Sequence, residues 1–170
     1  MSEALQLDAR KKIYSAIERF PGIHFRELGR ETGMRTGNLE YHLRYLEKAK
    51  LIQSHKTKGS KRFYSKELDG QELKLLGVLR QKTFRTILIK LLQDPGINHK
   101  KLVGYLGISP SSVTWYMNQL IEKNLVQPSK HGREKKYVVK NKEEIVKLLI
   151  VYQESFLDKL VDRFVETWEE

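Results

Sequence analysis

The feature that most constrains this fold is an internal repeat without gaps. Shifting the chain by 74 residues aligns residues 21–65 with residues 95–139. The identical pairs include turn and apolar residues: Pro21/Pro95, Gly22/Gly96, Leu28/Leu102, Gly33/Gly107 and Leu46/Leu120. Such positions define a backbone and its core, whereas exposed positions such as Arg35/Ser109 have diverged. The chain is therefore expected to contain two copies of one small fold.

Each copy predicts three helices followed by a β-hairpin. Apolar residues at helical spacing predict the first and third helices of the first copy: Ile13, Ile17 and Phe20, then Leu39, Leu43 and Leu46. A short helix is expected between them, over about residues 25–31. The run LIQSHKTKGSKRFYS then predicts two strands around a basic turn. The second copy repeats this plan, with a longer helix at about 71–93 and with Asn98 and Ser109 as N-cap residues.

Helix, helix, turn, helix and basic hairpin is the order of a winged helix-turn-helix domain. The predicted fold class is mainly α with small β-hairpin wings, arranged as two tandem winged helix-turn-helix domains and a long C-terminal helix. The expected boundaries are residues 8–68 for the N-terminal domain, 69–140 for the second domain and 142–170 for the C-terminal helix.

Two stretches carry a resemblance to a known family. The run PGIHFRELGRETGMRTGNLEYHLRYLEKAKLI resembles the first domain, and LKLLGVLRQKTFRTILIKLLQDPGINHKKLVGYLGISPSSVTWYMNQL the second, of archaeal tandem winged-helix transcriptional regulators related to the ArsR and MarR types. The similarity covers roughly residues 10–140. Such proteins include a regulator of the archaellum operon and factors that recruit transcription factor B. The resemblance implies double-stranded promoter DNA as a partner, with basal transcription factors as further partners.

The charge of the chain favours a polyanionic partner. Lys and Arg number 32 against 21 Asp and Glu, which gives a net charge of +11. Residues 1–68 carry +7, residues 69–141 carry +8 and residues 142–170 carry −4. Nucleic acid is the first candidate and an anionic membrane surface the second. No apolar run reaches ~18 residues and the start lacks a signal-peptide pattern, so we expect a cytoplasmic, nucleoid-associated protein without a membrane partner.

The first domain is expected to contact DNA with its third helix and its hairpin. Arginine suits guanine and asparagine suits adenine, while basic wings suit phosphates or the minor groove. The candidates are Arg35, Thr36, Asn38, Tyr41, His42, Tyr45, Lys56, Lys58, Lys61 and Arg62. In the ArsR-like pattern the position of His42 often holds histidine. The alternatives are that His42 packs the helix against its domain and that the wing is a solvated charged hairpin.

The second domain offers a less charged helix and an equally basic hairpin. The candidates are Ser109, Ser111, Ser112, Thr114, Trp115, Asn118, Lys130, Arg133, Lys135 and Lys136. Trp115 is ambiguous, because packing in the core or between domains is an equally good explanation of its position. We therefore expect the first domain to recognise most of the bases, while the second adds phosphate contacts, a second subsite or a surface for protein partners.

The C-terminal segment has an apolar stripe that needs a partner. The candidates for a dimer seam are Leu149, Tyr152, Phe156, Leu160 and Phe164. A homodimer through this helix is favoured, because its acidic outer face would avoid DNA. The alternative is that the stripe packs on the protein's own domains.

No constellation of catalytic residues is present in the sequence. The chain has no cysteine, no phosphate-binding loop and no histidines at the spacing of metal ligands, so neither an enzyme nor a cofactor or metal site is expected.

A sequence-specific transcriptional regulator is the leading hypothesis. The alternatives are a non-specific architectural DNA-binding protein and a tandem winged-helix module for protein interaction; the basic wings argue against the latter.

Overall fold

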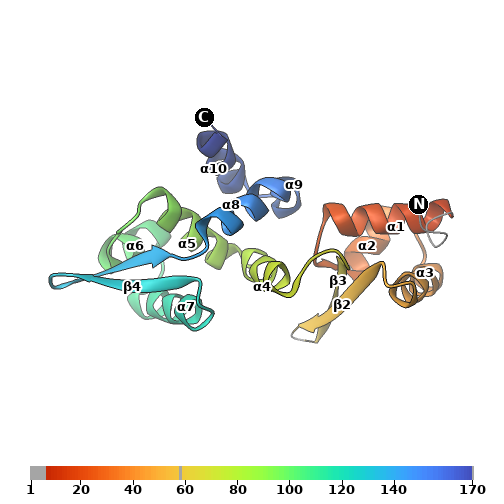
Figure 1. Ribbon diagram of the computed structural model, residues 1–170, viewed down its shortest axis with the longest axis horizontal. Helices are drawn as coiled ribbons and strands as arrows, with labels where there is room; N and C mark the ends of the chain where they lie inside the picture. Colours follow the sequence, from red (N-terminus) through yellow and green to blue (C-terminus); the bar gives the residue numbers. More distant parts are fainter. Residues whose placement is uncertain (1–6, 58, 170) are drawn as a thin grey trace. The chain divides into compact units, whose positions relative to one another are not determined.

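The chain divides into two compact units. A computed structural model describes residues 7–57 and 59–169. The first unit is Met1–Gly77 with Glu154–Leu157, and the second is Val78–Gln153 with Asp158–Glu170. The division after residue 77 comes later than the boundary at 68/69 expected from the sequence. Each unit is described by itself (Figure 1).

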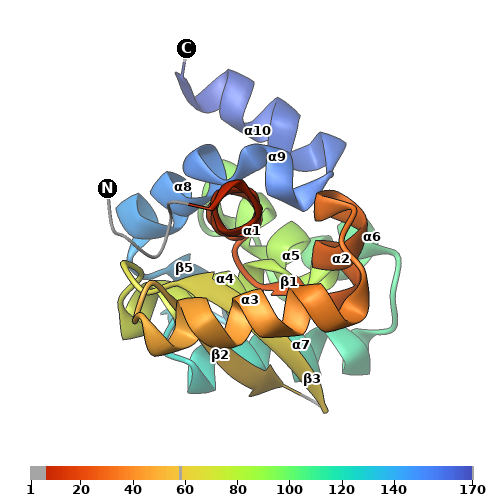
Figure 2. The ribbon, with the colours of Figure 1, turned by 90° about the vertical axis from the view of Figure 1, so that its right-hand side faces the viewer.

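The N-terminal part of the first unit, residues 8–65, contains three helices and a small antiparallel sheet. Its elements are α1 (Asp8–Arg19), β1 (Ile23–His24), α2 (Phe25–Thr32), α3 (Thr36–Lys48), β2 (Ile52–Thr57) and β3 (Ser60–Ser65). The strand order is β1-β3-β2, so the short β1, which was not predicted, adds an edge to the hairpin. In Figure 2, α3 crosses the front of this unit and the hairpin projects below it.

The core of the first unit is formed by the predicted apolar stripes. Ile13, Ile17, Leu39 and Leu46 have no exposed surface, and Phe63 of β3 is 2% exposed. Burial of such side chains stabilises a fold by about 1.5–3 kcal/mol each. These contacts leave the opposite side of α3 free to face solvent.

The remaining elements repeat this plan and add a C-terminal extension. They are α4 (Gly70–Leu79), α5 (Lys82–Gln93), α6 (His99–Leu106), α7 (Pro110–Glu122), β4 (Val126–His131), β5 (Glu134–Val139), α8 (Lys142–Val151), α9 (Gln153–Phe156) and α10 (Lys159–Glu169). The predicted caps are confirmed, because Asn98 accepts a hydrogen bond from the N–H of Lys101 and Ser109 accepts one from the N–H of Ser112.

The two hairpins share one register, as the gapless alignment requires. Ile52 pairs with Ser65 in the first hairpin, and Val126 pairs with Val139 in the second. A bridge between Asn98 and Lys136 lies at the position that β1 and β3 occupy in the first unit. The two copies therefore share a backbone plan down to single hydrogen-bonded pairs.

The helix expected over 71–93 is two helices, which corrects the prediction. α4 ends at Leu79, and Gln81 is the N-cap residue of α5. The Nη1 of Arg85 donates hydrogen bonds to the carbonyl oxygens of Leu79 and Arg80 at 2.7 and 3.4 Å. Carbonyl groups at a helix end lack partners within the helix, so this buried arginine stabilises the break.

The single helix expected over 142–170 is three helices, α8, α9 and α10. Leu157 adopts a φ of +49°, which no α-helix accommodates. Asp158 then caps α10, because its Oδ1 accepts a hydrogen bond from the N–H of Leu160 at 3.0 Å. Its Oδ2 also accepts a hydrogen bond from Arg85 Nη2 at 2.6 Å. The contact with α5 explains a break that the sequence, without Gly or Pro, did not signal.

Within the described residues, no helix has both the length and the apolar character needed to cross a bilayer.

Candidate nucleic-acid interface

The third helix of the first unit, α3, has one buried face and one exposed face. Its buried face consists of three leucines with 0–3% exposure: Leu39, Leu43 and Leu46. The opposite side, which we call the outward face of α3, consists of Gly37, Tyr41, Arg44 and Lys48. All four are exposed, and Tyr41 keeps 62% of its surface. The sequence interpretation missed Arg44 and Lys48, although their spacing from Tyr41 of three and seven residues gave the signal.

The predicted contacts near the start of α3 are also accessible. Arg35, Thr36 and Asn38 are exposed. Arg35 has the extended backbone of an N-cap residue but makes no side-chain cap hydrogen bond. Its guanidinium group is therefore not used to cap its own helix.

Two predicted contact residues lie on the side of α3 that approaches α1. The guanidinium carbon of Arg10 is 3.4 Å from the centre of the Tyr45 ring, which covers one face of that ring. His42 is half-buried, and its Nδ1 is buried without a hydrogen-bond partner. Burial, and then the positive charge of Arg10, lower the pKa of His42. This partial burial is compatible with the alternative that His42 packs α3 against its own domain, and its contact with DNA stays a prediction.

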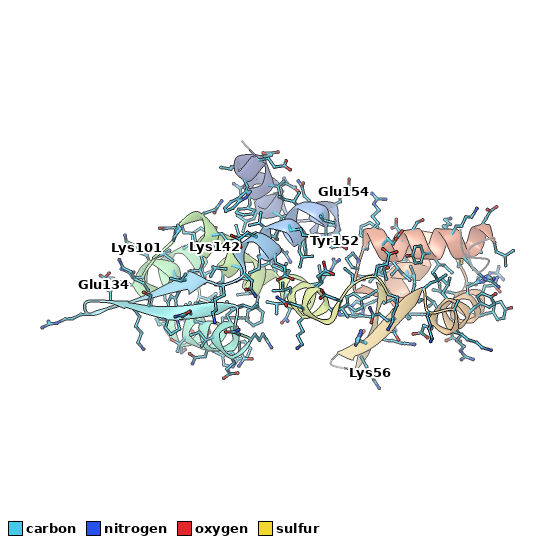
Figure 3. The ribbon with its side chains drawn as sticks, in the orientation of Figure 1. Lys56, Lys101, Glu134, Lys142, Tyr152 and Glu154 are labelled. Carbon is cyan, nitrogen blue, oxygen red and sulfur yellow. The ribbon has the colours of Figure 1, made fainter. Side chains whose placement is uncertain are left out.

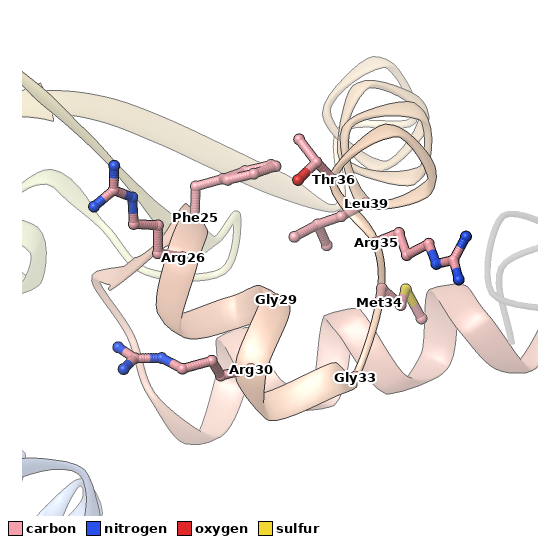
Figure 4. A pocket seen from close by; sticks show the side chains of 9 residues that line it. All are labelled: Phe25, Arg26, Gly29, Arg30, Gly33, Met34, Arg35, Thr36 and Leu39. Atoms are coloured by element: carbon pink, nitrogen blue, oxygen red, sulfur yellow. The ribbon is translucent and has the colours of Figure 1, made fainter.

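A hollow of about 660 Å³ separates α2 from α3. Its floor includes Phe25 and Leu39, and the Phe25 side chain reaches toward Leu39 (Figure 4). Arg26, Arg30 and Arg35 line the same hollow and extend outward from it. Sequence reasoning missed the two α2 arginines, whose spacing of four residues on a short exposed helix was the available signal. The hollow beside α3 is thus lined by three arginines and by no acidic residue.

The first wing presents fewer free cations than expected. Lys56 is exposed near the tip of the hairpin (Figure 3), and Lys58 lies outside the described residues. Lys61 forms an ion pair with Glu47 of α3 at 3.1 Å. The Nη1 of Arg62 donates a hydrogen bond to the carbonyl oxygen of Gly22 at 2.8 Å. This bond ties β3 to the turn before β1, so Arg62 has a structural contact, and its contact with DNA stays a prediction.

The predicted hydroxyl contacts of α7 are largely satisfied within the domain. The Oγ of Ser109 lies 3.1 Å from Ser111 Oγ and 2.7 Å from Ser112 Oγ, and it accepts the N–H of Ser112 at 3.2 Å. Thr114 Oγ1 donates to the carbonyl oxygen of Pro110 at 3.0 Å and lies 3.1 Å from His99 Nε2. These side chains fix the start of α7 and its contact with α6.

The outward face of α7 consists of Ser111, Trp115, Asn118 and Glu122. Each lies 74 residues after its counterpart on the outward face of α3. Trp115 keeps 55% of its surface, so it is not a core residue. One side of its ring packs on Phe84 and Tyr116, with centroids 6.3 and 5.0 Å away. The indole ring therefore has aromatic neighbours and also a large solvent-exposed surface.

The cationic side chains of the second wing differ in their exposure. Arg133 and Lys135 are exposed, whereas Lys136 is half-buried in β5. Lys130 lies in β4, and its side chain is outside the described part of the structure. Glu134 lies near the same tip (Figure 3) and brings a negative charge to it.

The expected dimer seam is partly used by the protein's own core. Leu149, Phe156 and Phe164 are 0%, 8% and 1% exposed, while Tyr152 and Leu160 are half-buried. α10 contacts α5 and α8, which matches the alternative that this stripe packs internally. The exposed apolar side chains of the segment are others: Val151, Leu157 and Trp168, with exposures of 59%, 91% and 47%. Val151 and Trp168 line a hollow of about 480 Å³ together with Val146 and Ile150.

Within residues 7–57 and 59–169, no group of three or more His, Asp or Glu side chains is placed to hold a metal ion.

Two family models match the chain in succession. The first, described as an N-terminal HTH domain, matches residues 7–76. The second, described as winged helix-turn-helix DNA-binding, matches residues 80–127. The chain is a tandem winged helix-turn-helix protein. Domains of this kind occur in transcriptional regulators, and neither match describes an enzyme.

A curated relative supports the same assignment for this tandem winged helix-turn-helix protein. An uncharacterized HTH-type transcriptional regulator of Methanocaldococcus jannaschii is 31% identical over 132 residues. The match covers 78% of this chain and 33% of the relative. The chain thus spans about a third of the length of the relative it matches.

Solved structures show more distant likenesses to the tandem winged helix-turn-helix protein. One, described as "Possible transcriptional regulator for arsenical resistance", is 27% identical, covers 55% of this chain and 94% of that chain, and has a TM-score of 0.38. A conserved hypothetical protein from Chlorobium tepidum is 14% identical, covers 84% of this chain and 98% of that chain, and has a TM-score of 0.30. TM-scores of this size do not establish a shared overall fold.

Proposed function

We propose that this protein is a sequence-specific regulator of transcription that binds double-stranded DNA. The observation that carries the proposal is the outward face of α3, where Tyr41, Arg44 and Lys48 are exposed on a helix whose other side is buried. A helix held in this way enters the major groove, which is about 12 Å wide, with its free side chains toward the base edges.

The surroundings of α3 suit the phosphates on either side of such a groove. Arg26 and Arg30 of α2 lie beside it, and Lys56 extends from the first wing. In the second unit Arg133 and Lys135 extend from the other wing. Cations of this kind contact phosphates or the minor groove and supply binding energy that does not depend on sequence. The net charges of +7 and +8 on the two repeat-containing segments favour rapid encounter with DNA.

The partners follow from the same surfaces. Promoter DNA in the nucleoid of the cytoplasm is the primary partner, and basal transcription factors are candidates for contact with surfaces that DNA leaves free. A homodimer is proposed through the exposed apolar side chains of the C-terminal segment, Val151 and Trp168, in place of the buried stripe. In a dimer, the DNA-binding surfaces of the two copies would contact two paired half-sites.

Selection from a random duplex library tests the proposal directly. The purified chain would be incubated near physiological salt with competitor DNA, and the retained duplexes would be sequenced. An enriched motif is the expected result, and two spaced half-sites within it would support the dimer. Retention without enrichment would indicate an architectural protein, and no retention would overturn the proposal in favour of a module for protein interaction.

A matched pair of variants gives this selection its control. Arg44→Ala removes a cation from the outward face of α3, whereas Arg163→Ala removes one from an exposed position of α10. The two changes alter the net charge equally. Only Arg44→Ala is expected to change the motif, since a general loss of positive charge would affect both variants alike.

A further inference from the structure

The outward face of α7 differs chemically from that of α3 at matched positions. On α3 the second, third and fourth positions are Tyr41, Arg44 and Lys48. On α7 the matching residues are Trp115, Asn118 and Glu122. The whole of α7, PSSVTWYMNQLIE, contains no lysine or arginine, although the segment from 69 to 141 carries a net charge of +8. The cations of the second unit therefore lie outside its recognition helix.

We propose that α7 recognises A·T base pairs while α3 recognises guanine, so that the DNA site contains two chemically different parts. The proposal rests on the proposed function, because it assumes that both helices enter a major groove. It goes further by assigning a class of base pair to each helix and by naming Asn118 and Trp115 as determinants of specificity.

The chemistry of the α7 side chains supports A·T base pairs. The side-chain amide of Asn118 can donate to N7 and accept from the N6 amino group of adenine, which is the bidentate pairing of asparagine. The apolar ring of Trp115 suits the methyl group of thymine. The usual partner of guanine in the major groove is an arginine or lysine, and α7 has neither.

The Trp115 ring has two aromatic neighbours before any DNA is bound. Phe84 is 3% exposed and packs on one side of the indole, and Tyr116 meets it edge to face at an interplanar angle of 82°. Little side-chain entropy remains to be lost when this ring contacts a base. The carboxylate of Glu122 accepts a hydrogen bond from Gln119 at 3.1 Å, near the end of the helix. It is thus held in the last turn, beyond the turns that contact bases.

The chemistry of α3 points to guanine. Arg44 occupies the position that Asn118 has on α7, and it is exposed. A guanidinium group binds O6 and N7 of guanine through two parallel hydrogen bonds. Arginine at this position therefore predicts a preference for guanine, and asparagine at the matched position predicts a preference for adenine.

Reciprocal substitutions test this inference. The library selection would be repeated with Asn118→Arg, Arg44→Asn and the control Arg163→Ala. The wild-type motif is expected to contain an A·T segment and a guanine-containing segment. Asn118→Arg should raise the enrichment of guanine at one position of the A·T segment by about 10-fold or more. It should leave the guanine-containing segment unchanged. Arg44→Asn should do the reverse.

A fluorescence measurement reports directly on the Trp115 side chain. The chain has two tryptophans, so Trp168→Phe leaves Trp115 as the only one. Binding of the selected duplex is expected to change the Trp115 emission, and a duplex whose A·T segment is replaced by G·C should change it about 10-fold less at equal concentration. Thermal melting of each variant confirms that it is folded.

The outcomes separate this inference from the proposed function. If no motif is enriched, the proposed function fails. If a motif is enriched but Asn118→Arg alters none of its positions, the function stands and this inference is overturned. In that case α7 would be a surface for a protein partner.

Discussion

Gly22 shows how a single residue ties the first wing to the helices. Its φ is +85°, a conformation that side chains rarely allow. Its N–H donates to the carbonyl oxygen of Phe63 at 2.8 Å, and its own carbonyl oxygen accepts the hydrogen bond from Arg62. A Cβ atom here would lie 3.2 Å from the ring of Tyr64. Both the backbone and the packing therefore require glycine.

Gly22→Ala is accordingly expected to lower the free energy of unfolding by about 1–3 kcal/mol, because it forces an L side chain into a left-handed conformation. Thermal or urea unfolding measures the change. Gly37→Ala is the matched control, since Gly37 lies in α3 with no atom within 4 Å of a Cβ. This control should be neutral or stabilising by up to about 1 kcal/mol. Equal losses in both variants would contradict the explanation.

Arg44 is the residue on which recognition by the first unit is expected to depend. Arg44→Ala should weaken binding to the preferred duplex by about 1–3 kcal/mol and relax one base position. Titration of labelled duplexes that differ at single positions measures both effects.

Lys56→Ala should instead weaken binding to all sequences alike and reduce the slope of log K against log salt by about 1. Intact specificity in Arg44→Ala would show that α3 is docked differently.

At the scale of elements, the helices depend on contacts that the sequence does not display. Arg85 and Asp158 have side chains 6% and 11% exposed and form an ion pair of 2.6 Å. Burial alone raises the pKa of Asp158, but hydrogen bonds from Arg85 and from the N–H of Leu160 outweigh it and hold the pKa below its ordinary value. The pair fixes the start of α10 and the end of α4 together.

Asp158→Ala is expected to destabilise the second unit by about 3–5 kcal/mol, because it removes the carboxylate that pairs with the buried guanidinium group of Arg85. Urea unfolding at pH 7 measures this loss. Asp94→Ala is the control, since Asp94 pairs with Lys90 at 3.5 Å on the surface and such pairs contribute about 0.3–0.5 kcal/mol. Similar losses in the two variants would contradict the assignment.

The pH dependence of the same pair has a definite sign. A carboxylate whose pKa is lower in the folded state stabilises the fold above the pKa of the unfolded state, about 3.9. This contribution is lost as the pH falls through the lower pKa of the folded state. The stabilities of the wild type and of Asp158→Ala should therefore converge in acid.

The sequence predicted the elements whose signals are local. The cap residues Asn98 and Ser109 and the leucine stripe of α3 follow from rules that involve three or four neighbouring residues, and the structure confirms them. The breaks near residues 80 and 157 depend on a contact between positions 73 residues apart, Arg85 and Asp158. No local pattern contains that information, and so the sequence predicted continuous helices.

In the candidate site, too, the sequence predicted features that depend on local spacing and missed those that depend on distant residues. Helical spacing predicted that Asn38 and Tyr41 are exposed, and the exposed side of α3 follows from its leucines. The partial burial of His42 and its proximity to Arg10, which lies 32 residues earlier, could not be predicted from local spacing, and its contact with DNA stays a prediction. The role of Arg62 was likewise hidden, since its partner is a backbone carbonyl group of residue 22.

At the scale of the whole chain, positive and negative net charge are separated along the sequence. The segment 142–170 carries −4 and exposes Val151 and Trp168, whereas both repeats are basic. An acidic segment with exposed apolar side chains is suited to a protein surface and is repelled by DNA. This separation supports the proposal that the C-terminal segment joins two copies.

Trp168→Glu is expected to weaken that dimer, because it places a charge against the apolar hollow formed with Ile150. Sedimentation velocity over a range of concentrations measures the shift toward monomer. Glu166→Gln, an exposed change on the same helix, is the control and should leave association unchanged. A wild-type chain that sediments as a monomer at all concentrations would overturn the dimer.

The constant offset of 74 residues has a consequence for how such a protein changes over time. Caps, recognition helix and wing correspond position by position, so a segment taken from one copy meets the same loop lengths in the other. In a duplicated fold of this kind, the outward side chains of one copy can change while those of the other copy stay the same. New regulatory connections can then arise without any change to the scaffold.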